Sequence, residues 1–290
     1  MQIIENDVLK VVISEHGAEL QSIYHKGKER EFLWQGDETY WSRRAPIFFP
    51  IVGKLANNTY YIKGKDYHLT RNGFTRDLDF EVVEKLPDYV KFRLDANEHT
   101  FLVYPYDFRI TVSYRLIDNR IVVKYKVYNK TNELLYFSIG GSPAFNTNLT
   151  PNGYEDYYLE FGTPLTLKTK VLDSEVGLLT YEEKVIGDKI DTLPLTYELF
   201  KENDTLILEN INQVSLKNRV NDDEVKLTTF SFPLLAVWSP NRMKSPFVCL
   251  EPWQGAPDYV GLPQELSDKA YIESVYPGGK FRSMFTIDII

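Results

Sequence analysis

Four segments of the chain combine aromatic side chains with guanidinium, amide or carboxylate groups next to glycine or proline. They are residues 34–55, 69–77, 137–146 and 248–258. Aromatic faces stack on the apolar C–H face of a pyranose, and planar polar groups bind its hydroxyls in pairs. Apolar walls with a few fixed polar groups are also typical of small-ligand sites. The combination favours a sugar-binding site, although any one segment alone is better explained by turns of a large β-protein, with Pro and Gly in the turns and aromatics in the core.

Other kinds of catalytic site find little support. The four histidines are His16, His25, His68 and His99. They are scattered, the lone Cys249 lies near none of them in sequence, and no zinc-ligand spacing is present. No phosphate-binding glycine loop occurs, and Gly140-Gly141-Ser142-Pro143 lacks the later glycine of a nucleophile elbow. We therefore expect no metal site.

The charge balance excludes some partners. The formal net charge is −8 and the pI is near 5.2, and no Lys or Arg run forms a phosphate-binding stripe. We expect no nucleic-acid partner. No apolar run approaches the roughly 20 residues that span a bilayer, and the N-terminus lacks the features of a signal peptide. One cysteine cannot form an internal disulfide. A cytoplasmic protein with no membrane partner is expected.

The four segments must be positioned by the rest of the chain, where apolar and polar residues mostly alternate with a period of two. Residues 108–116 and 121–127 alternate apolar and polar side chains, and residues 117–120 supply the turn of a hairpin. Such alternation places one face of a strand on a core. Further strands are predicted over residues 8–14, 19–24, 59–62, 80–84, 89–94, 134–139, 157–161, 205–208, 225–230, 232–238, 247–250 and 283–288.

Helical periodicity is limited to two short candidates, residues 197–201 and 264–269, and residues 163–183 follow no regular period. Many strands with few helices predict an all-β fold, a large antiparallel sandwich or barrel. We find no repeat and no low-complexity linker, so we expect residues 1–290 to form a single domain.

The order of several motifs resembles that of the aldose 1-epimerase (galactose mutarotase) superfamily, in the branch related to the lactose-operon X protein. The resemblance runs from about Val8 to the C-terminus. The motifs, in order, are LWQGD at 33–37, RRAPIFFPIVG at 43–53, NGFTRD at 72–77, YPYDF at 104–108, FSIGGSPAFN at 137–146 and CLEPW at 249–253. One match would be unremarkable, but the ordered series is specific.

The resemblance implies an antiparallel β-supersandwich and a reaction that interconverts the α and β anomers of a free sugar without a metal or organic cofactor. A base removes the proton of the anomeric hydroxyl, and an acid delivers a proton to the ring oxygen. The ring opens, the aldehyde carbon turns, and the ring closes on the other face.

The resemblance also implies roles for individual residues. The family's glutamate base falls on Glu251, whose alternative is a solvated carboxylate at a strand end. Lys54 falls where relatives usually carry a sugar-binding arginine, and it keeps the charge without the two-pronged geometry. The other expected substrate-binding residues are Arg76, Asp77, Asp204, Trp253 and His68. Arg76 and Asp77 could equally pair with each other, and Asp204 could belong to a turn before a strand.

Two departures from the family pattern bear on catalysis. Asn72 stands where relatives usually have the histidine of HGFARD, and Ser142 stands where they have the histidine of GGHP. Neither side chain titrates near pH 7, although Asn72 can donate a hydrogen bond to a ring oxygen. Losing a general acid typically lowers a rate by about 10² to 10⁴. His68 is a possible substitute if its strand continues to Asn72, because residues four apart share one face of a strand; a tyrosine or a water could also relay the proton.

Two functions therefore remain open. The first is an aldose 1-epimerase of reduced or altered mechanism, with Glu251 as base and Asn72 and Ser142 in the active site. The second is a non-catalytic carbohydrate-binding module or sugar sensor. In both cases the partner is a small sugar, and the chain is expected to be a monomer or weak homodimer. The sequence does not identify the sugar, and a phosphorylated hexose would need a basic cluster, for which Arg43, Arg44, Lys54, Arg71 and Arg76 are available.

Overall fold

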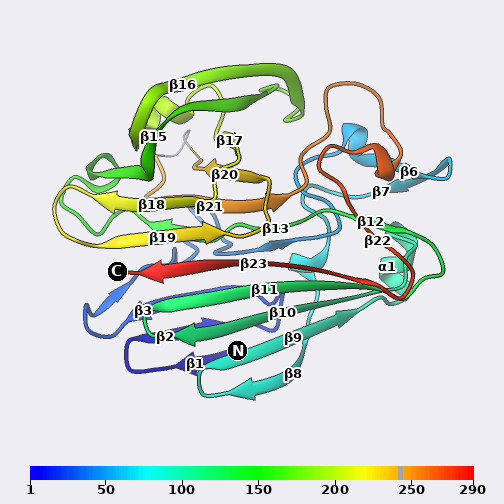
Figure 1. Cartoon of the computed structure of the whole chain (residues 1–290), viewed down its shortest axis with the longest axis horizontal. Coiled ribbons are helices and arrows are strands. Elements are labelled where there is room, and N and C mark those ends of the chain that lie inside the picture. Colours follow the sequence, from blue (N-terminus) through cyan, green and yellow to red (C-terminus); the bar gives the residue numbers. More distant parts are fainter. Residues whose placement is uncertain (241–243) are drawn as a thin grey trace.

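The computed structural model describes residues 1–240 and 244–290, and nearly all of its regular elements are antiparallel strands (Figure 1). One sheet of fifteen strands runs in the order β5-β13-β21-β20-β17-β15-β18-β19-β23-β11-β10-β9-β8, with β14 beside β21 and β16 beside β15. Its strands are β5 (Ile47–Phe48), β8 (Glu81–Leu86), β9 (Tyr89–Asp95), β10 (Phe108–Ile117), β11 (Arg120–Asn129), β13 (Ile139–Gly141), β14 (Ala144–Asn146), β15 (Tyr157–Leu172), β16 (Leu179–Pro194), β17 (Thr205–Glu209), β18 (Gln213–Asn218), β19 (Glu224–Thr229), β20 (Leu234–Trp238), β21 (Phe247–Gln254) and β23 (Lys280–Ile289). The predicted all-β class is confirmed.

Three smaller sheets complete the architecture. They are β1 (Gln2–Glu5) to β4 (Arg30–Glu31) with β2 (Leu9–Ile13) and β3 (Leu20–His25) between them, the hairpin of β6 (Thr59–Ile62) and β7 (Lys65–His68), and the pair of β12 (Leu135–Phe137) and β22 (Glu273–Val275). No helix in the described part of the chain is long and apolar enough to cross a membrane.

The predicted hairpin forms the centre of the lower half of Figure 1. β10 and β11 pair from Phe108↔Asn129 to Ile117↔Arg120, so the two-residue turn is Asp118-Asn119. Asp118 has φ 52°, a left-handed conformation that Asp tolerates better than most residues. Alternate residues of both strands are buried, as the sequence pattern requires.

The first sheet closes the core against this half of the large sheet. β1 contacts β9 and β10, and the buried residues of β1 to β3 belong to the same apolar cluster as those of β9 to β11. Tyr114 of β10 is buried, and its hydroxyl donates a 2.7 Å hydrogen bond to the carbonyl of Ala18. Burial of this apolar area is the main stabilising contribution to the fold.

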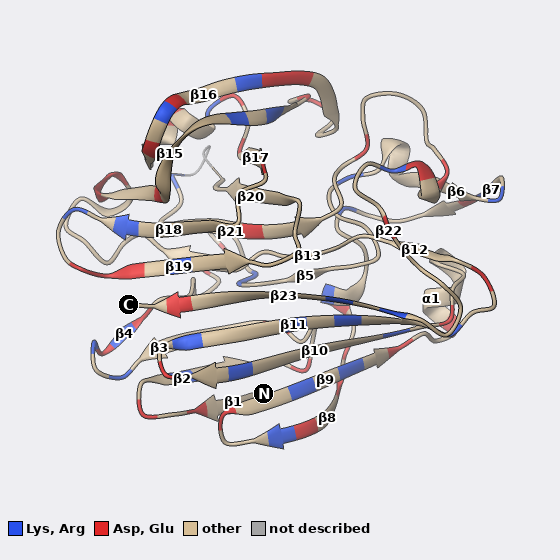
Figure 2. Cartoon of the chain, viewed as in Figure 1, with Lys and Arg blue, Asp and Glu red and all other residues tan. Residues whose placement is uncertain are grey.

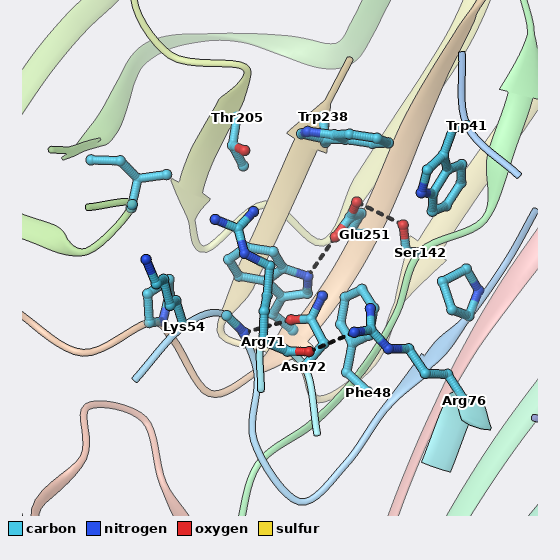
Figure 3. A pocket seen from close by; sticks show the side chains of 16 residues that line it. Trp41, Phe48, Lys54, Arg71, Asn72, Arg76, Ser142, Thr205, Trp238 and Glu251 are labelled. Atoms are coloured by element: carbon cyan, nitrogen blue, oxygen red, sulfur yellow. Dashed lines mark hydrogen bonds between the residues drawn. The ribbon is translucent and has the colours of Figure 1, made fainter. Parts of the chain in front are cut away.

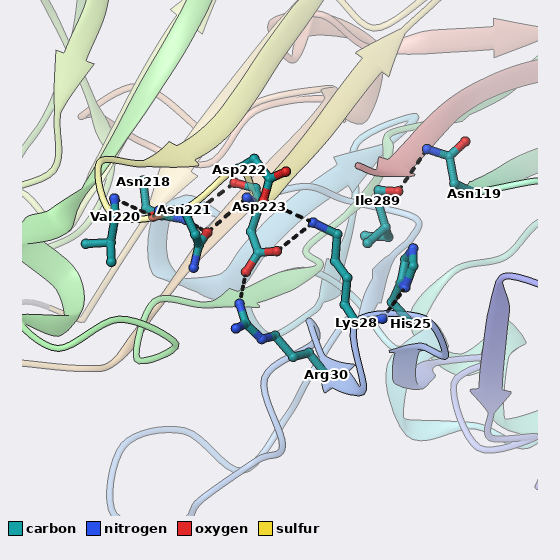
Figure 4. Close-up of polar contacts among 10 residues, drawn as sticks. All are labelled: His25, Lys28, Arg30, Asn119, Asn218, Val220, Asn221, Asp222, Asp223 and Ile289. Atoms are coloured by element: carbon teal, nitrogen blue, oxygen red, sulfur yellow. Dashed lines mark hydrogen bonds and ion pairs between the residues drawn. The ribbon is translucent and has the colours of Figure 1, made fainter.

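A buried aspartate ties the first sheet to the turn between β18 and β19 (Figure 4). Asp223 is 6% exposed, accepts a 2.8 Å hydrogen bond from Lys28 Nζ, and pairs with Arg30 on β4. The turn itself is closed by Asn218, whose Oδ1 accepts hydrogen bonds from the backbone of Val220 and Asn221. Segments far apart in the sequence are thereby fixed to each other.

The stretch expected to lack regular structure is instead a long two-stranded ribbon. β15 and β16 are paired through most of residues 163–183, and the ribbon arches over β17 and β20 at the top of Figure 1. Their register shifts at several points between Glu160 and Leu172. Each shift moves the buried side chains out of a strict period of two, and much of β16 is exposed. The sequence therefore lacks the alternation of apolar and polar residues from which these strands could be predicted.

Helical structure is sparse. The two helical candidates become short 3-10 turns at Tyr197–Phe200 and Leu266–Asp268. The one α-helix in residues 1–240 and 244–290, α1 (Glu98–Val103), was not expected. Asn97 caps it by accepting hydrogen bonds from the backbone of His99 and Thr100, while the Thr100 side chain bonds the backbone of Asn97.

Candidate functional site

An open cavity of about 150 Å³ lies where β21 and β5 meet the loops around residues 53 and 72 (Figure 3). Among the residues that line it are six of the predicted site residues: Lys54, Asn72, Arg76, Ser142, Glu251 and Trp253. They come from four separate parts of the chain. The antiparallel pairing of β13 with β5 and β21 brings three of these parts together, and a bridge between Phe49 and Gly73 adds the loop of Asn72 and Arg76.

Glu251 lies on β21 deep in this cavity and is 4% exposed. β21 is flanked by β20 on one edge and by β13 and β14 on the other, so its residues are almost all buried. Each carboxylate oxygen of Glu251 accepts one hydrogen bond. Ser142 Oγ donates to Oε1 at 2.7 Å, and Trp253 Nε1 donates to Oε2 at 2.9 Å. The carboxyl group is therefore held in one orientation.

Burial raises the pKa of Glu251 from 4.5 to about 7 because a charged carboxylate loses its hydration there. The hydrogen bonds from Ser142 and Trp253 oppose this rise by stabilising the charged form. The negative charge of Asp204 raises the pKa further, and the positive charge of Arg71 lowers it. A carboxyl group poised near neutral pH can both accept and release a proton, which suits general base catalysis.

Asn72 is fixed by a reciprocal pair of hydrogen bonds with Gly53. Its Oδ1 accepts from Gly53 N at 2.7 Å, and its own N donates to Gly53 O at 2.9 Å. The other side-chain atom of the amide, the donor Nδ2, has no hydrogen-bond partner among the described residues. Asn72 has φ 67°, a conformation that Asn adopts more readily than most residues. The next residue must be glycine, since a Cβ on Gly73 would lie 2.1 Å from the carbonyl oxygen of Phe49.

Three cations occupy the wall nearest Asn72. Lys54 Nζ donates a 2.8 Å hydrogen bond to the carbonyl of Val176. Arg76 donates from Nη2 to the carbonyl of Arg71 at 2.9 Å. The Arg71 guanidinium has no hydrogen-bond or ion-pair partner within residues 1–240 and 244–290, and Figure 3 shows it reaching into the cavity below Thr205.

Aromatic rings form the apolar part of the cavity. Trp41 and Trp238 meet edge to face with ring centroids 5.0 Å apart. Phe48 and Trp253 also line the cavity, and Figure 3 shows Phe48 below Glu251, away from these two rings. Tryptophan faces are well suited to the apolar face of a sugar ring. The cavity therefore combines aromatic walls, one carboxyl group and several fixed donors.

Three predicted residues lie outside this lining. Asp77 pairs with Arg43 at 2.5 Å. Asp204 faces the neighbouring cavity, and its Oδ1 accepts a hydrogen bond from Thr205. His68 ends β7 on an exposed hairpin and bonds Thr59 Oγ1 at 3.0 Å. The strand does not continue to Asn72, because a turn follows, so the two side chains do not share a face.

Sequence reasoning left Trp41, Thr205 and Trp238 out of the predicted site, and it named Arg71 only as part of a basic cluster available for a phosphorylated hexose. Trp41 and Arg71 belong to the segments of mixed composition, residues 34–55 and 69–77. Their place in these segments was the sequence feature that could have identified them as site residues. Trp238 falls in an apolar run typical of a buried strand, and it is the last residue of β20. Nothing in the local sequence distinguishes it from a core residue. Within the described residues, no group of three His, Cys, Asp or Glu side chains could hold a metal ion.

Comparisons with known proteins agree with the fold and the arrangement of motifs. The family model for aldose 1-epimerase matches residues 1–265. The chromosomally encoded protein LacX of Lactococcus lactis subsp. lactis is 31% identical over 297 aligned positions, which cover 99% of this chain and 98% of that protein.

Solved structures give the same result. A galactose mutarotase-like protein from Lactobacillus casei superposes with a TM-score of 0.94 at 32% identity, over 100% of both chains. A galactose mutarotase related enzyme from Lactobacillus acidophilus gives a TM-score of 0.92 at 35% identity, over 100% of this chain and 97% of that one. The chain therefore belongs to the aldose 1-epimerase family and has the galactose mutarotase-like fold.

Proposed function

We propose that the protein is an aldose 1-epimerase that interconverts the α and β anomers of an aldohexose, with Glu251 as the base. The observation that carries the proposal is the single buried carboxyl group, held by Ser142 and Trp253, at the bottom of a cavity with aromatic walls. Its pKa of about 7 leaves a large fraction as carboxylate at neutral pH.

In the proposed reaction Glu251 takes the proton of the anomeric hydroxyl. The C1–O1 bond becomes a carbonyl, and the bond from C1 to the ring oxygen breaks. Negative charge develops on the ring oxygen, which is stabilised by hydrogen bonds from the Asn72 amide and the nearby guanidinium groups and takes a proton from water. After rotation about the C1–C2 bond, the ring hydroxyl attacks the other face of C1 and gives its proton to the hydroxide left from that water, and Glu251 returns its proton to O1.

The hydrogen-bond donors around the ring oxygen can stabilise the transition state although they do not titrate near neutral pH. Fixed donors aimed at a developing charge stabilise a transition state because they need no reorganisation. Asn72 is fixed by Gly53 and has Nδ2 available, so it meets this requirement. Ser142 Oγ already donates to Glu251, and we assign it a positioning role instead of a role as the acid.

A second candidate function is sugar binding without turnover. It is favoured by one observation: no histidine is among the described residues that line the cavity. Stacking on tryptophan and hydrogen bonds to hydroxyls do not require an acid, so binding would survive without catalysis.

The two functions are separated by following the anomerisation of freshly dissolved pure α anomers in a polarimeter. The panel contains glucose, galactose and their 6-phosphates, each with and without protein. An epimerase accelerates the approach to equilibrium for at least one sugar, in proportion to protein concentration. A rate equal to the buffer blank for every sugar that binds would leave only the binding function.

A further inference from the structure

The lining of the cavity carries more positive than negative charge, in a chain whose net charge is −8. Lys54, Arg71 and Arg76 face a single carboxyl group, Glu251. Over the rest of the molecule, acidic and basic side chains are interspersed along the strands, as Figure 2 shows. The cluster is therefore a local feature and does not follow from the overall composition.

Lys54 and Arg71 converge at one point on the cavity rim. A Cβ built on Gly177 would lie 2.9 Å from Arg71 Nη2 and 4.0 Å from Lys54 Cδ. Both side chains also line the adjacent cavity that contains Asp204, so they stand where the two cavities join. A substituent of a sugar bound over Glu251 could reach both of them there.

These cations have little compensation from acidic side chains. Arg71 has no ion-pair partner in the described part of the chain, and the hydrogen-bond acceptor of Lys54 is a neutral carbonyl. Arg76 Nε is buried without a hydrogen-bond partner and lies 3.6 Å from Asp77 Oδ2. Asp77 itself is bonded to Arg43. Like charges held together in this way repel one another unless an anion binds between them.

The adjacent cavity limits how far an anion could extend. It is lined by the acidic residues Asp173, Glu175, Glu202 and Asp204, and by one cation besides Lys54 and Arg71, Lys201. Their negative charges oppose the entry of an anion, whereas Lys54 and Arg71 at the junction attract it. An anion is therefore expected to bind at the junction of the two cavities and not deeper in the adjacent one.

We propose that the sugar of this site carries an anionic oxygen-rich substituent, a phosphate ester or a carboxylate, that binds between Lys54 and Arg71. The inference rests on the proposed function for the placement of the sugar ring over Glu251. Arg71 supplies a planar pair of donors and Lys54 a point charge, a combination that suits phosphate.

The test measures both binding and anomerisation for three sugars of the same configuration: galactose, galactose 6-phosphate and galacturonate. Calorimetry gives each Kd, and NMR exchange gives each rate of anomerisation. We expect at least one anionic sugar to bind about 10- to 100-fold more tightly than galactose, which is the range for charge-assisted hydrogen bonds. The preference should weaken as salt is raised. Comparing galactose 6-phosphate with galacturonate identifies the anion.

Two single substitutions locate the anion site. Arg71→Gln and Lys54→Gln should each weaken binding of the anionic sugar at least about tenfold more than they weaken binding of galactose, so that most of the preference is lost. Arg71→Lys should recover part of it. Lys124→Gln, on the exposed face of β11, is the matched control and should leave the preference unchanged.

The outcomes separate the two proposals. Tighter binding of an anionic sugar without anomerisation supports the anion site and contradicts the epimerase function. Anomerisation of all three sugars with equal Kd values overturns the anion site and leaves the epimerase function standing. Equal affinity of the wild-type protein for charged and neutral sugars overturns the inference even if both variants fail to fold.

Discussion

The indole Nε1 of Trp253 donates a 2.9 Å hydrogen bond to Oε2 of Glu251, two residues earlier on the same strand. Residues two apart on a strand point to the same side of a sheet, so β21 presents the base together with one of the groups that orient it. Ser142 supplies the second donor from a different segment. Both donors favour the charged carboxylate and so oppose the effect of burial on the Glu251 pKa.

The pH dependence of anomerisation should therefore report on Trp253. If Glu251 must be deprotonated, kcat/KM rises with pH to a plateau, with a midpoint near the pKa of about 7. In Trp253→Phe the carboxylate loses a charge-assisted hydrogen bond, so its pKa rises and the midpoint should move up by about 1 on the pH scale. Tyr106→Phe, which changes an aromatic residue outside the cavity lining, is the control. A midpoint unchanged by Trp253→Phe would show that the indole does not position the base.

Asn72 should contribute through its amide donor. Asn72→Asp keeps an oxygen for the Gly53 N–H and so preserves the loop, but it removes the Nδ2 donor. We expect kcat/KM to fall about 10- to 100-fold, with little change in Tm. Rates and thermal melting are measured on the same preparations. Unchanged kcat/KM in a folded Asn72→Asp protein would remove Asn72 from the mechanism.

The buried carboxyl group should lower stability above neutral pH. Its pKa in the folded state is raised above 4.5, so the unfolded state gives up this proton first as pH rises. Folding stability is therefore lost between pH 4.5 and about 7, by about 3 kcal/mol at about 1.4 kcal/mol per pH unit.

Glu251→Gln removes this ionisation while keeping partners for Ser142 and Trp253, since Ser142 Oγ can accept from the amide. Urea unfolding should show the variant close to wild type at pH 5 and more stable at pH 8.5, by about 3 kcal/mol at most. An equal difference at the two pH values would mean that the Glu251 pKa is not raised in the folded protein.

Much of the fold could be predicted from residue patterns, since strands buried on one face carry the period of two that a core imposes. The β10–β11 hairpin is an example, with its turn residues between two alternating runs. The β15–β16 ribbon could not be predicted in the same way, because its register shifts and its exposure remove the alternation. α1 was missed because six residues are too few to show helical periodicity.

Some residues of the site could likewise be predicted from the sequence, and others could not. The mixed composition of four segments indicated a ligand site, and the resemblance to the family pointed to Glu251, Asn72 and Ser142 within them, which the structure places along one cavity. The position of His68 was not predictable, because it depends on where β7 ends. The role of Trp238 depends on which strand neighbours β21, and local sequence does not contain that information.

The most direct test of Glu251 as the base is NMR exchange between the α and β anomers of the best-bound sugar, with wild-type protein and Glu251→Gln at pH 8. The account predicts clear exchange above the buffer rate for the wild type, and a fall of at least about 100-fold toward the buffer rate for the variant, with Kd for the sugar within about tenfold of wild type. Exchange at the wild-type rate in a folded Glu251→Gln protein would contradict it.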